Sequence, residues 1–458
     1  MIRLFDNLPG ELLSEAALTA LLPYAGVSLT SLRDEHPGLL VFPDCLGTFG
    51  DNWKDEALYE FYGSSLKAGN VVGFFSVNGE QIQIQSRFDR NSAKQYFLHY
   101  MLGRVFGANL LNLPTLAEKE SMWDFLLYLF PFFLKKALRQ GILRRYQPFQ
   151  YNDSHVRGAI DVARHLRKNI PFNGRIAYQT RELAANNPII QQIRHTVEAI
   201  RINPMAGNIL SQDSEMKEAV QTIIELTPDY NRQDTIKVIA KNLRPVRHPY
   251  FTEYSVLQKL CLKILRHEKI NYGESEDKIH GIVFKAEWLW EEYLYTVLEQ
   301  CGIKHSRNNL RYSPEPIYLY RDHFQVYPDF FDEHFVFDAK YKHLDNGMLR
   351  EDRYQLISYI HIRRAIAGYL LYPNDKINSP FIEKEGDLSG HGGEVGTVAF
   401  SVPQSASVTS FEDYQNKIKE AEKYFCAKIQ AKRSNNNKAL SFAPQSGDVT
   451  EPSASRGD

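Results

Sequence analysis

The sequence predicts a multidomain α+β protein with a β-rich N-terminal domain, a mainly helical middle region and a C-terminal α/β domain. Three observations favour this fold class. At 458 residues, the chain exceeds the size that one hydrophobic core usually serves. Its first 90 residues are interrupted by turn signals, such as Pro9-Gly10 and Gly50-Asp51-Asn52. After about residue 279, helical and strand patterns alternate, which is typical of α/β layers.

We divide the chain into residues 1–90, 91–278, 279–432 and a tail at 433–458. The boundary after the middle region is placed between Asp277 and Ile282, behind a polar stretch. The tail is rich in Ser, Asn and Pro and cannot bury a core, so we expect it to be disordered.

Composition and charge do not identify a partner. The hydrophobic fraction of 43% and the charged fraction of 24% are ordinary for soluble globular proteins. A net charge of -1 gives no overall attraction to nucleic acid, so any such surface must be a local patch. The four cysteines form no Cys-x-x-Cys pair, which favours a reducing cytoplasm over a zinc site or a disulfide framework. We expect no signal peptide and no membrane span.

The clearest N-terminal element is a hairpin over residues 70–86, with Asn78-Gly79 as its turn. Ile82 and Ile84 alternate with glutamines, so we expect this sheet to be half-buried. The domain has either a scaffolding role or a role in partner docking.

In the middle region, apolar spacing predicts helices. They cover Ala93 to about Arg145, Arg181 to Ile202, Met216 to Leu226 and Tyr254 to Lys269. Pro131 should end or kink the first of them, and Asn187-Pro188 is a good helix start.

A basic zone lies within this region. Nine Lys or Arg residues occur between Lys135 and Lys168, against only Asp153 and Asp161. Such a zone suits contact with DNA phosphates. It also suits a solvated surface or the face of an acidic partner. The candidate DNA contacts, including one in the C-terminal domain, are Arg144, Arg145, Arg157, Arg164 and Lys342.

The C-terminal region contains the stretch that is richest in residues able to take part in catalysis. It reads as two strands joined by a tight turn at Asp332-Glu333-His334. Because side chains alternate along a strand, Asp338 and Lys340 share one face, and Asp329 on the neighbouring strand adds a second carboxylate. Two carboxylates suit magnesium, and a lysine beside them can align a water and stabilise negative charge on a phosphate. The alternative is a surface hairpin with a salt bridge.

Helices flank this hairpin. We expect them at Ala286 to Gln300, at Asp352 to Tyr369 and, after a strand at Gly396 to Val402, at Ser410 to Lys432. Glu291 on the first helix would offer a third carboxylate. Gln355 and Tyr359 lie four residues apart and therefore on one face of the second. The chain has no Gly-x-x-x-x-Gly-Lys-Ser/Thr loop, which argues against nucleotide hydrolysis by the chain itself.

With these residues in view, the chain resembles the McrC family, the nuclease subunits of McrBC modification-dependent restriction systems. Pro328-Asp329 and Asp338-Ala-Lys-Tyr-Lys342 look like the PD-(D/E)xK nuclease core in its McrC form. Asp352-Arg-Tyr-Gln355, Leu371-Tyr-Pro373 and Leu289-Trp-Glu-Glu-Tyr293 are similar to the helix after the core, the following strand and the preceding helix. Weaker likeness extends upstream to about Phe97.

The resemblance implies a restriction-endonuclease-like fold for the C-terminal domain and a magnesium-dependent endonuclease acting on double-stranded, modified DNA. Asp329 and Asp338 would hold the metal, Lys340 would serve the water, and Glu291 and Gln355 would support them. It also implies a partner, an McrB-like AAA+ GTPase hexamer, whose GTP hydrolysis this chain would stimulate. Two alternatives remain: a non-catalytic regulator of an AAA+ ring and a nuclease that needs no partner.

Overall fold

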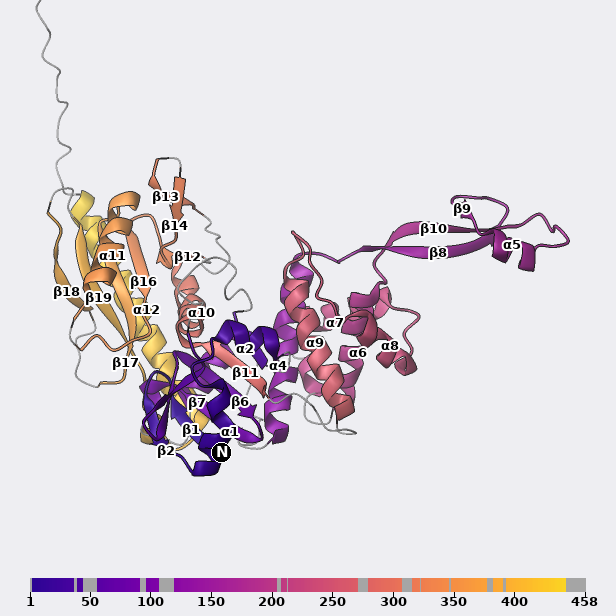
Figure 1. The fold of residues 1–458 in the computed structure, drawn as a ribbon. Helices are drawn as coiled ribbons and strands as arrows, with labels where there is room; N and C mark the ends of the chain where they lie inside the picture. Colours follow the sequence, from indigo (N-terminus) through magenta and orange to yellow (C-terminus); the bar gives the residue numbers. More distant parts are fainter. Residues whose placement is uncertain are drawn as a thin grey trace, which may run out of the picture.

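In the computed structural model, the described residues are 2–36, 39–43, 56–90, 96–106, 119–203, 207–211, 213–270, 279–306, 315–321, 323–345, 347–376, 382–389 and 393–441. The chain is mixed α/β with several sheets, as predicted. Figure 1 shows an N-terminal module, a bundle of helices, a long arm that projects from the bundle, and a C-terminal sheet flanked by helices. Within the described ranges, none of the helices is long and apolar enough to cross a membrane.

The N-terminal module contains a five-stranded sheet of order β1-β7-β6-β11-β3. The strands are β1 (Ile2–Phe5), β7 (Glu80–Gln85), β6 (Val71–Val77), β11 (Ile279–Lys285) and β3 (Leu39–Phe42). The predicted hairpin is confirmed, since β6 and β7 pair across Asn78-Gly79, where both residues have positive φ. The module is completed by β2 (Pro9–Leu12), β4 (Tyr59–Tyr62), β5 (Ser65–Ala68), α1 (Glu15–Leu21) and α2 (Leu29–Glu35).

Strand β11 differs from expectation. It follows the expected boundary, yet it pairs antiparallel with β6 and parallel with β3 in the N-terminal sheet. Gly281 and Gly73 permit this close pairing, because a Cβ on Gly281 would lie 2.4 Å from the Phe74 carbonyl oxygen. The chain then enters the C-terminal domain directly from this sheet. The polar stretch before the expected boundary lies outside the described residues.

Most of the middle region is a bundle of helices, but residues 176–184 form a strand, so the helix expected from Arg181 begins only at Pro188. Its helices are α3 (Tyr96–Phe106), α4 (Lys119–Arg139), α6 (Pro188–Ile202), α7 (Ser214–Leu226), α8 (Thr235–Lys241) and α9 (Glu253–Ile270). Asn187 caps α6, as its Oδ1 accepts from the N–H groups of Ile189 and Ile190 at 3.1 and 3.3 Å. Pro131 lies inside α4, which continues past it to Arg139.

The arm comprises residues 145–184 and was not predicted. Its strands β8 (Arg145–Asp153) and β10 (Ile176–Ala184) pair antiparallel, with β9 (Ala159–Ile160) and α5 (Val162–Lys168) near the far end. It extends away from both the bundle and the C-terminal sheet (Figure 1). Most of its side chains are exposed or half-buried, so the strands lack the apolar alternation that reveals a strand in sequence.

The C-terminal domain contains a six-stranded sheet of order β12-β15-β16-β17-β19-β18. The strands are β12 (Lys304–His305), β15 (Phe330–Phe331), β16 (Phe335–Ala339), β17 (Ala367–Asn374), β18 (Ile382–Asp387) and β19 (Glu394–Ser401). Strands β16, β17 and β19 are parallel, and β15 pairs antiparallel with β16. The predicted hairpin is therefore present, and Asp332 Oδ1 closes its turn by accepting from the N–H groups of His334 and Phe335. A separate hairpin, β13 (Ile317–Tyr320) and β14 (His323–Val326), precedes it.

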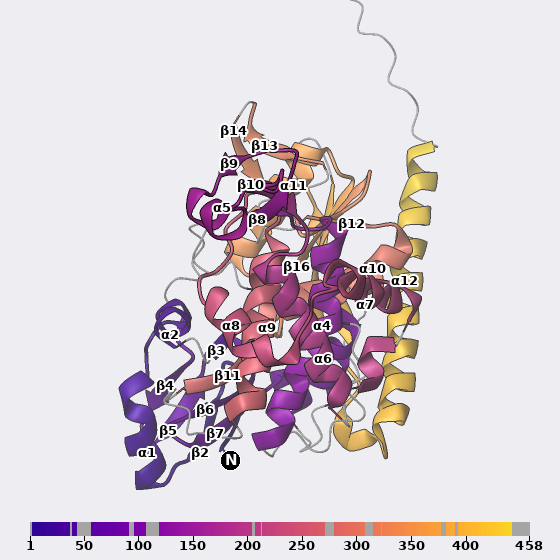
Figure 2. The ribbon, with the colours of Figure 1, turned by 90° about the vertical axis from the view of Figure 1, so that its right-hand side faces the viewer.

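Helices cover both faces of this sheet. Helix α11 (Arg350–Arg363) packs on the face that includes Val336 and Leu370. Helices α10 (Ala286–Leu298) and α12 (Phe411–Ser441) pack on the face that includes Phe337. Figure 2 shows α12 along one side of the molecule, where its Glu422 accepts from hydroxyls on α3 and α10. Helix α12 continues through residues 433–441, which we expected to be disordered, and 442–458 lie outside the described residues.

Candidate functional site

The hairpin brings the two predicted carboxylates together. Asp338 lies near the end of β16, and Asp329 immediately precedes β15, whose Phe330 pairs with Phe337. The backbone N–H of Ala339 donates to Asp329 Oδ2 at 2.6 Å, which ties the two strands at this point. Both carboxylates are buried, with Asp338 only 2% exposed.

Lys340 lies beside these two carboxylates, as expected from the strand face that it shares with Asp338. Its Nζ is 2.6 Å from Asp338 Oδ2 and donates to Gln355 Oε1 at 3.1 Å. Gln355 Nε2 in turn donates to the Tyr359 hydroxyl at 3.1 Å, and that hydroxyl donates to the Tyr327 carbonyl at 3.3 Å. Helix α11 therefore holds the lysine against the hairpin through the two side chains that share one helix face.

Glu291 reaches the same site from α10. Its Oε1 is 2.8 Å from Nε2 of His305, a residue of β12 that sequence reasoning missed. A two-residue strand offers no pattern that could have revealed this histidine.

The electrostatics of the site are those of crowded, buried carboxylates. Burial raises the pKa of Asp329 well above its usual range, and the carboxylates of Glu291 and Asp338 raise it further. Burial also raises the pKa of Glu291, with Glu292 and Asp338 adding to the effect. Burial raises the pKa of Asp338, against the opposing effect of Lys340. Burial disfavours the charged form of Lys340, but Asp338 and Asp329 outweigh this, and its pKa is raised.

The chemistry of these donors fits a magnesium ion. Magnesium takes one or two carboxylates and keeps water on its other positions. Asp329 and Asp338 supply two carboxylates, and burial raises the pKa of both although Lys340 opposes the shift. Among the described residues, no group of three or more His, Cys, Asp or Glu stands in an arrangement that would hold a metal. The fit therefore rests on two carboxylates with water completing the shell.

Lys342, a candidate DNA contact, lies next to this site but is paired. It forms an ion pair with Asp352 of α11, and Lys340 Nζ lies 3.7 Å from the other oxygen of the same carboxylate. Asp352 is buried, at 8% exposed. Because its two carboxylate oxygens contact the two lysines, it holds both of them against α11. The position of Lys342 in the sequence does not indicate this pairing with Asp352, because the pairing depends on where α11 packs.

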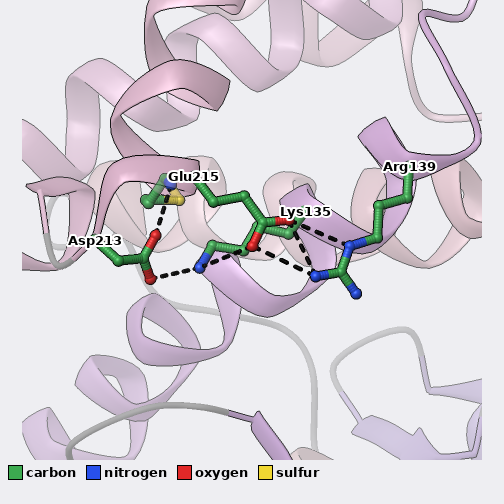
Figure 3. Close-up of polar contacts among 5 residues, drawn as sticks. Lys135, Arg139, Asp213 and Glu215 are labelled. Carbon is green, nitrogen blue, oxygen red and sulfur yellow. Dashed lines mark hydrogen bonds and ion pairs between the residues drawn. The ribbon is translucent and has the colours of Figure 1, made fainter.

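The first part of the basic zone holds helices together. Lys135 Nζ lies 2.6 Å from Asp213, and Arg139 donates to Glu215 at 3.0 Å, so α4 is joined to the start of α7 (Figure 3). Lys136 pairs in the same way with Glu253 of α9 at 3.2 Å. These three cations are engaged within the bundle.

The other basic candidates lie on the arm or at its base. Arg164 donates to the carbonyl oxygens of Tyr151 and Tyr178, at 3.0 and 2.5 Å, and so stabilises the arm itself. Arg157 donates to the Tyr178 hydroxyl at 3.2 Å and lies over the Tyr151 ring. Arg144 and Arg145 are exposed. The structure does not bring these four arginines to the hairpin site, because the arm points away from the C-terminal sheet (Figure 1).

Together, the fold and the site define a mixed α/β protein with several sheets and with a buried cluster of acidic residues and one lysine on a hairpin of its C-terminal sheet. A family model described as "McrBC 5-methylcytosine restriction system component" matches residues 66–373. The chain belongs to this family, and the resemblance seen in the sequence is confirmed. The match includes both strands of the site hairpin and the flanking helices α10 and α11, and it ends before α12.

Two solved structures are similar to this chain. One is a half-complex from a tetradecameric assembly of Thermococcus gammatolerans McrB AAA+ hexamers with bound McrC, at 16% identity and a TM-score of 0.48, covering 94% of this chain and 99% of that one. The other is the Thermococcus gammatolerans McrBC complex, at 16% identity and a TM-score of 0.33, covering 66% of this chain and 88% of that one. A comparison with curated proteins found no match.

Proposed function

We propose that the chain is a magnesium-dependent endodeoxyribonuclease subunit of a restriction complex that acts on DNA modified with 5-methylcytosine. It cuts when assembled with an McrB-like AAA+ GTPase hexamer and stimulates the GTP hydrolysis of that ring. The observation that carries this proposal is the cluster of Asp329, Asp338 and Lys340 on one hairpin, within 2.6 Å for the closest pair. Membership of a restriction-system family supports it.

In this proposal, Asp329 and Asp338 hold the ion, and Lys340 acts on the attacking water and on the phosphate. A bound magnesium ion would supply positive charge that polarises the scissile phosphate. The ammonium of Lys340 orients the water and stabilises the negative charge that develops on the phosphate oxygens. The side chain of Lys340 is 21% exposed, so a substrate phosphate can approach it.

The surrounding residues restrict the freedom of Lys340. Gln355 Oε1 accepts a hydrogen bond from the Lys340 ammonium at 3.1 Å, and Asp338 Oδ2 lies 2.6 Å from the same nitrogen. The Tyr359 hydroxyl accepts a hydrogen bond from Gln355 Nε2, and this contact orients the Gln355 amide so that its oxygen faces Lys340. Because a small displacement of a reacting group is costly in rate, these contacts contribute to catalysis without touching the phosphate.

Exposed apolar side chains on the arm support the proposal that this chain binds a partner protein. Near its far end, Val162, Leu166, Ile170 and Phe172 are between 53% and 68% exposed. Apolar side chains gathered on a projecting element are typical of protein interaction sites. The arm therefore also favours the second candidate function, a non-catalytic regulator that docks on an AAA+ ring.

A cleavage assay tests the proposal. The chain is mixed with its GTPase partner, GTP, magnesium and methylated plasmid, and nicking and double-strand cleavage are followed on gels. We expect Asp338→Asn to abolish cleavage while GTPase stimulation persists. Asp387→Asn, which changes an exposed aspartate on β18 of the same sheet, serves as the matched control and should cut normally.

The alternatives give different results. Cleavage that persists in a folded Asp338→Asn variant would exclude the proposed site. GTPase stimulation without cleavage by the wild-type chain would favour the non-catalytic regulator. Cleavage by the isolated chain would identify a nuclease that needs no partner.

A further inference from the structure

Three consecutive residues of the short 3-10 helix η3 (Arg87–Asp89) connect the N-terminal module to the C-terminal domain. Arg87 Nη2 donates to the carbonyl oxygen of Tyr341 at 2.7 Å. The Phe88 ring packs edge-on against the Tyr341 ring, with centroids 4.9 Å apart. Asp89 accepts a hydrogen bond from the backbone N–H of Ser405 at 3.0 Å. The contact therefore reaches the residue that directly follows the site lysine.

Arg87 is itself rigidly held. Its Nε lies 2.9 Å from Asp6 Oδ2, and its backbone N–H donates to Asp6 Oδ1 at 2.6 Å. Its Nη2 also donates to Asn70 Oδ1 at 2.8 Å. Arg87 is 7% exposed and Asp6 is 0% exposed. A planar guanidinium fixed at this many points can hold a carbonyl oxygen in one place, which a flexible ammonium cannot do equally well.

Tyr341 lies between this clamp and the site. Beyond the end of β16, the Lys340 N–H donates to the Leu371 carbonyl at 2.8 Å, which is a contact to β17. Tyr341 points the other way, where its hydroxyl lies 2.6 Å from Ser86 Oγ and its ring lies under the Arg87 guanidinium at 5.0 Å. The backbone at Lys340 is therefore held on one side by the C-terminal sheet and on the other by the N-terminal module.

We propose that Arg87 is a positioning residue for Lys340, so that the N-terminal module sets the turnover of the hairpin site. This rests on the proposed nuclease function. Without the Arg87 contact, the buried Tyr341 carbonyl loses its donor and the segment after β16 gains freedom. Lys340 then spends less time against Asp338 and Gln355, which lowers kcat while the DNA-contacting surface is unchanged.

The test compares Arg87→Gln with Arg87→Lys in the full chain assembled with its GTPase partner. We expect kcat for cleavage to fall at least about tenfold in Arg87→Gln, with KM for DNA and GTPase stimulation within about twofold of wild type. Arg87→Lys keeps a donor and a positive charge and should recover part of the loss. An unchanged kcat in folded Arg87→Gln would overturn the inference.

Arg433→Gln is the matched control. Arg433 also binds a buried carboxylate and a backbone carbonyl, with Nε 2.6 Å from Asp332 Oδ2 and Nη1 2.8 Å from the Cys301 oxygen. Substituting Arg433 should therefore destabilise the fold about as much as substituting Arg87. Arg433, however, lies at the turn end of the hairpin, away from Lys340. Its kcat should stay near wild type, and an equal loss in this variant would show that Arg87 has only a structural role.

Hydrogen exchange gives a readout that does not depend on cleavage. In Arg87→Gln, the Lys340 amide should exchange at least about tenfold faster, while the amides of β17 keep their protection. If the wild-type complex proves inactive, the proposed function fails, yet faster exchange at Lys340 still supports the clamp. Unchanged exchange at Lys340 would overturn the clamp whether or not the complex cuts DNA.

Discussion

The site hairpin and the arm are both built on antiparallel strands that carry charged side chains, but they differ in how far those side chains are exposed to solvent. In the hairpin, burial raises the pKa of Asp329 and Asp338. On the arm, hydrogen bonds from Thr180 and Tyr151 lower the pKa of Glu182 instead. Buried charge is costly and is retained where it can hold a cation or a phosphate, whereas exposed charge on the arm costs little.

The two elements also differ in their apolar side chains. The hairpin buries Phe335 and Phe337 in the sheet core, whereas the arm exposes Ile170 and Phe172. A buried hairpin can hold reacting groups in one geometry, and a projecting arm can reach a partner. We therefore expect changes in the hairpin to affect chemistry and changes in the arm to affect assembly.

The largest expected effect is at Lys340. In the proposed nuclease, Lys340→Met should lower the cleavage rate about 10²- to 10³-fold, or about 3–4 kcal/mol in the barrier, because the charge developing on the phosphate loses its partner. Binding to the GTPase ring should not change. Single-turnover cleavage at saturating partner measures this effect. Lys384→Met, an exposed lysine on β18, is the control, and equal losses in both variants would contradict the assignment.

The second largest effect that we expect is a pH dependence of the free energy of unfolding, caused by the buried carboxylate of Asp6. Burial raises the pKa of Asp6 to about 6, so its native form binds a proton more readily than the unfolded chain does. Wild type should therefore lose stability relative to Asp6→Asn as the pH rises from 4 through 6, and about 1.4 kcal/mol of this loss should fall between pH 5 and pH 8. Denaturant unfolding of both proteins at pH 5 and pH 8 measures the difference.

Glu182→Gln on the arm is the exposed counterpart for that experiment. The pKa of Glu182 is lowered, so its contribution is complete above pH 5 and the difference from wild type should be flat between pH 5 and pH 8. A flat difference for Asp6→Asn as well would show that its carboxylate titrates normally.

A smaller effect is expected at the far end of the arm. Phe172→Asp should weaken binding to the GTPase ring about tenfold, because a charge replaces an exposed aromatic contact. Cleavage by the saturated complex should be normal. Titration of the ring by calorimetry measures the affinity. Leu12→Asp, at another exposed apolar residue on the body, should have no effect, and normal binding by Phe172→Asp would exclude this end of the arm as the docking element.

The smallest effect separates two arginines of the arm. Arg145 is exposed, so Arg145→Gln should lower the slope of log K for DNA against log salt by about 0.9 and leave stability unchanged. Arg164 binds two carbonyl oxygens of the arm, so Arg164→Gln should lower the melting temperature instead. Fluorescence anisotropy at several salt concentrations decides whether Arg145 contacts phosphate. An unchanged slope would leave the arginine as a solvated or protein-facing residue.

Much of the fold could be predicted where a pattern is local. The alternation that places Asp338 with Lys340, the Asn78-Gly79 turn and the Asn187 cap each depend on a few neighbouring residues. The geometry of Gln355 and Tyr359 also followed from helical spacing. The basic zone was visible, but whether each cation is paired could not be inferred, because Lys135 meets Asp213 only after α4 and α7 pack.

The sequence by itself determined the hairpin, its two carboxylates and lysine, and the family to which they point. Only the tertiary structure decided that β11 completes the N-terminal sheet, that Asp352 holds Lys342, and that Arg87 reaches Tyr341. The physical reason is that local spacing selects which face a side chain takes, whereas burial between distant segments selects its partner. Contacts across 254 residues, such as that of Arg87 with Tyr341, leave no local pattern in a single sequence.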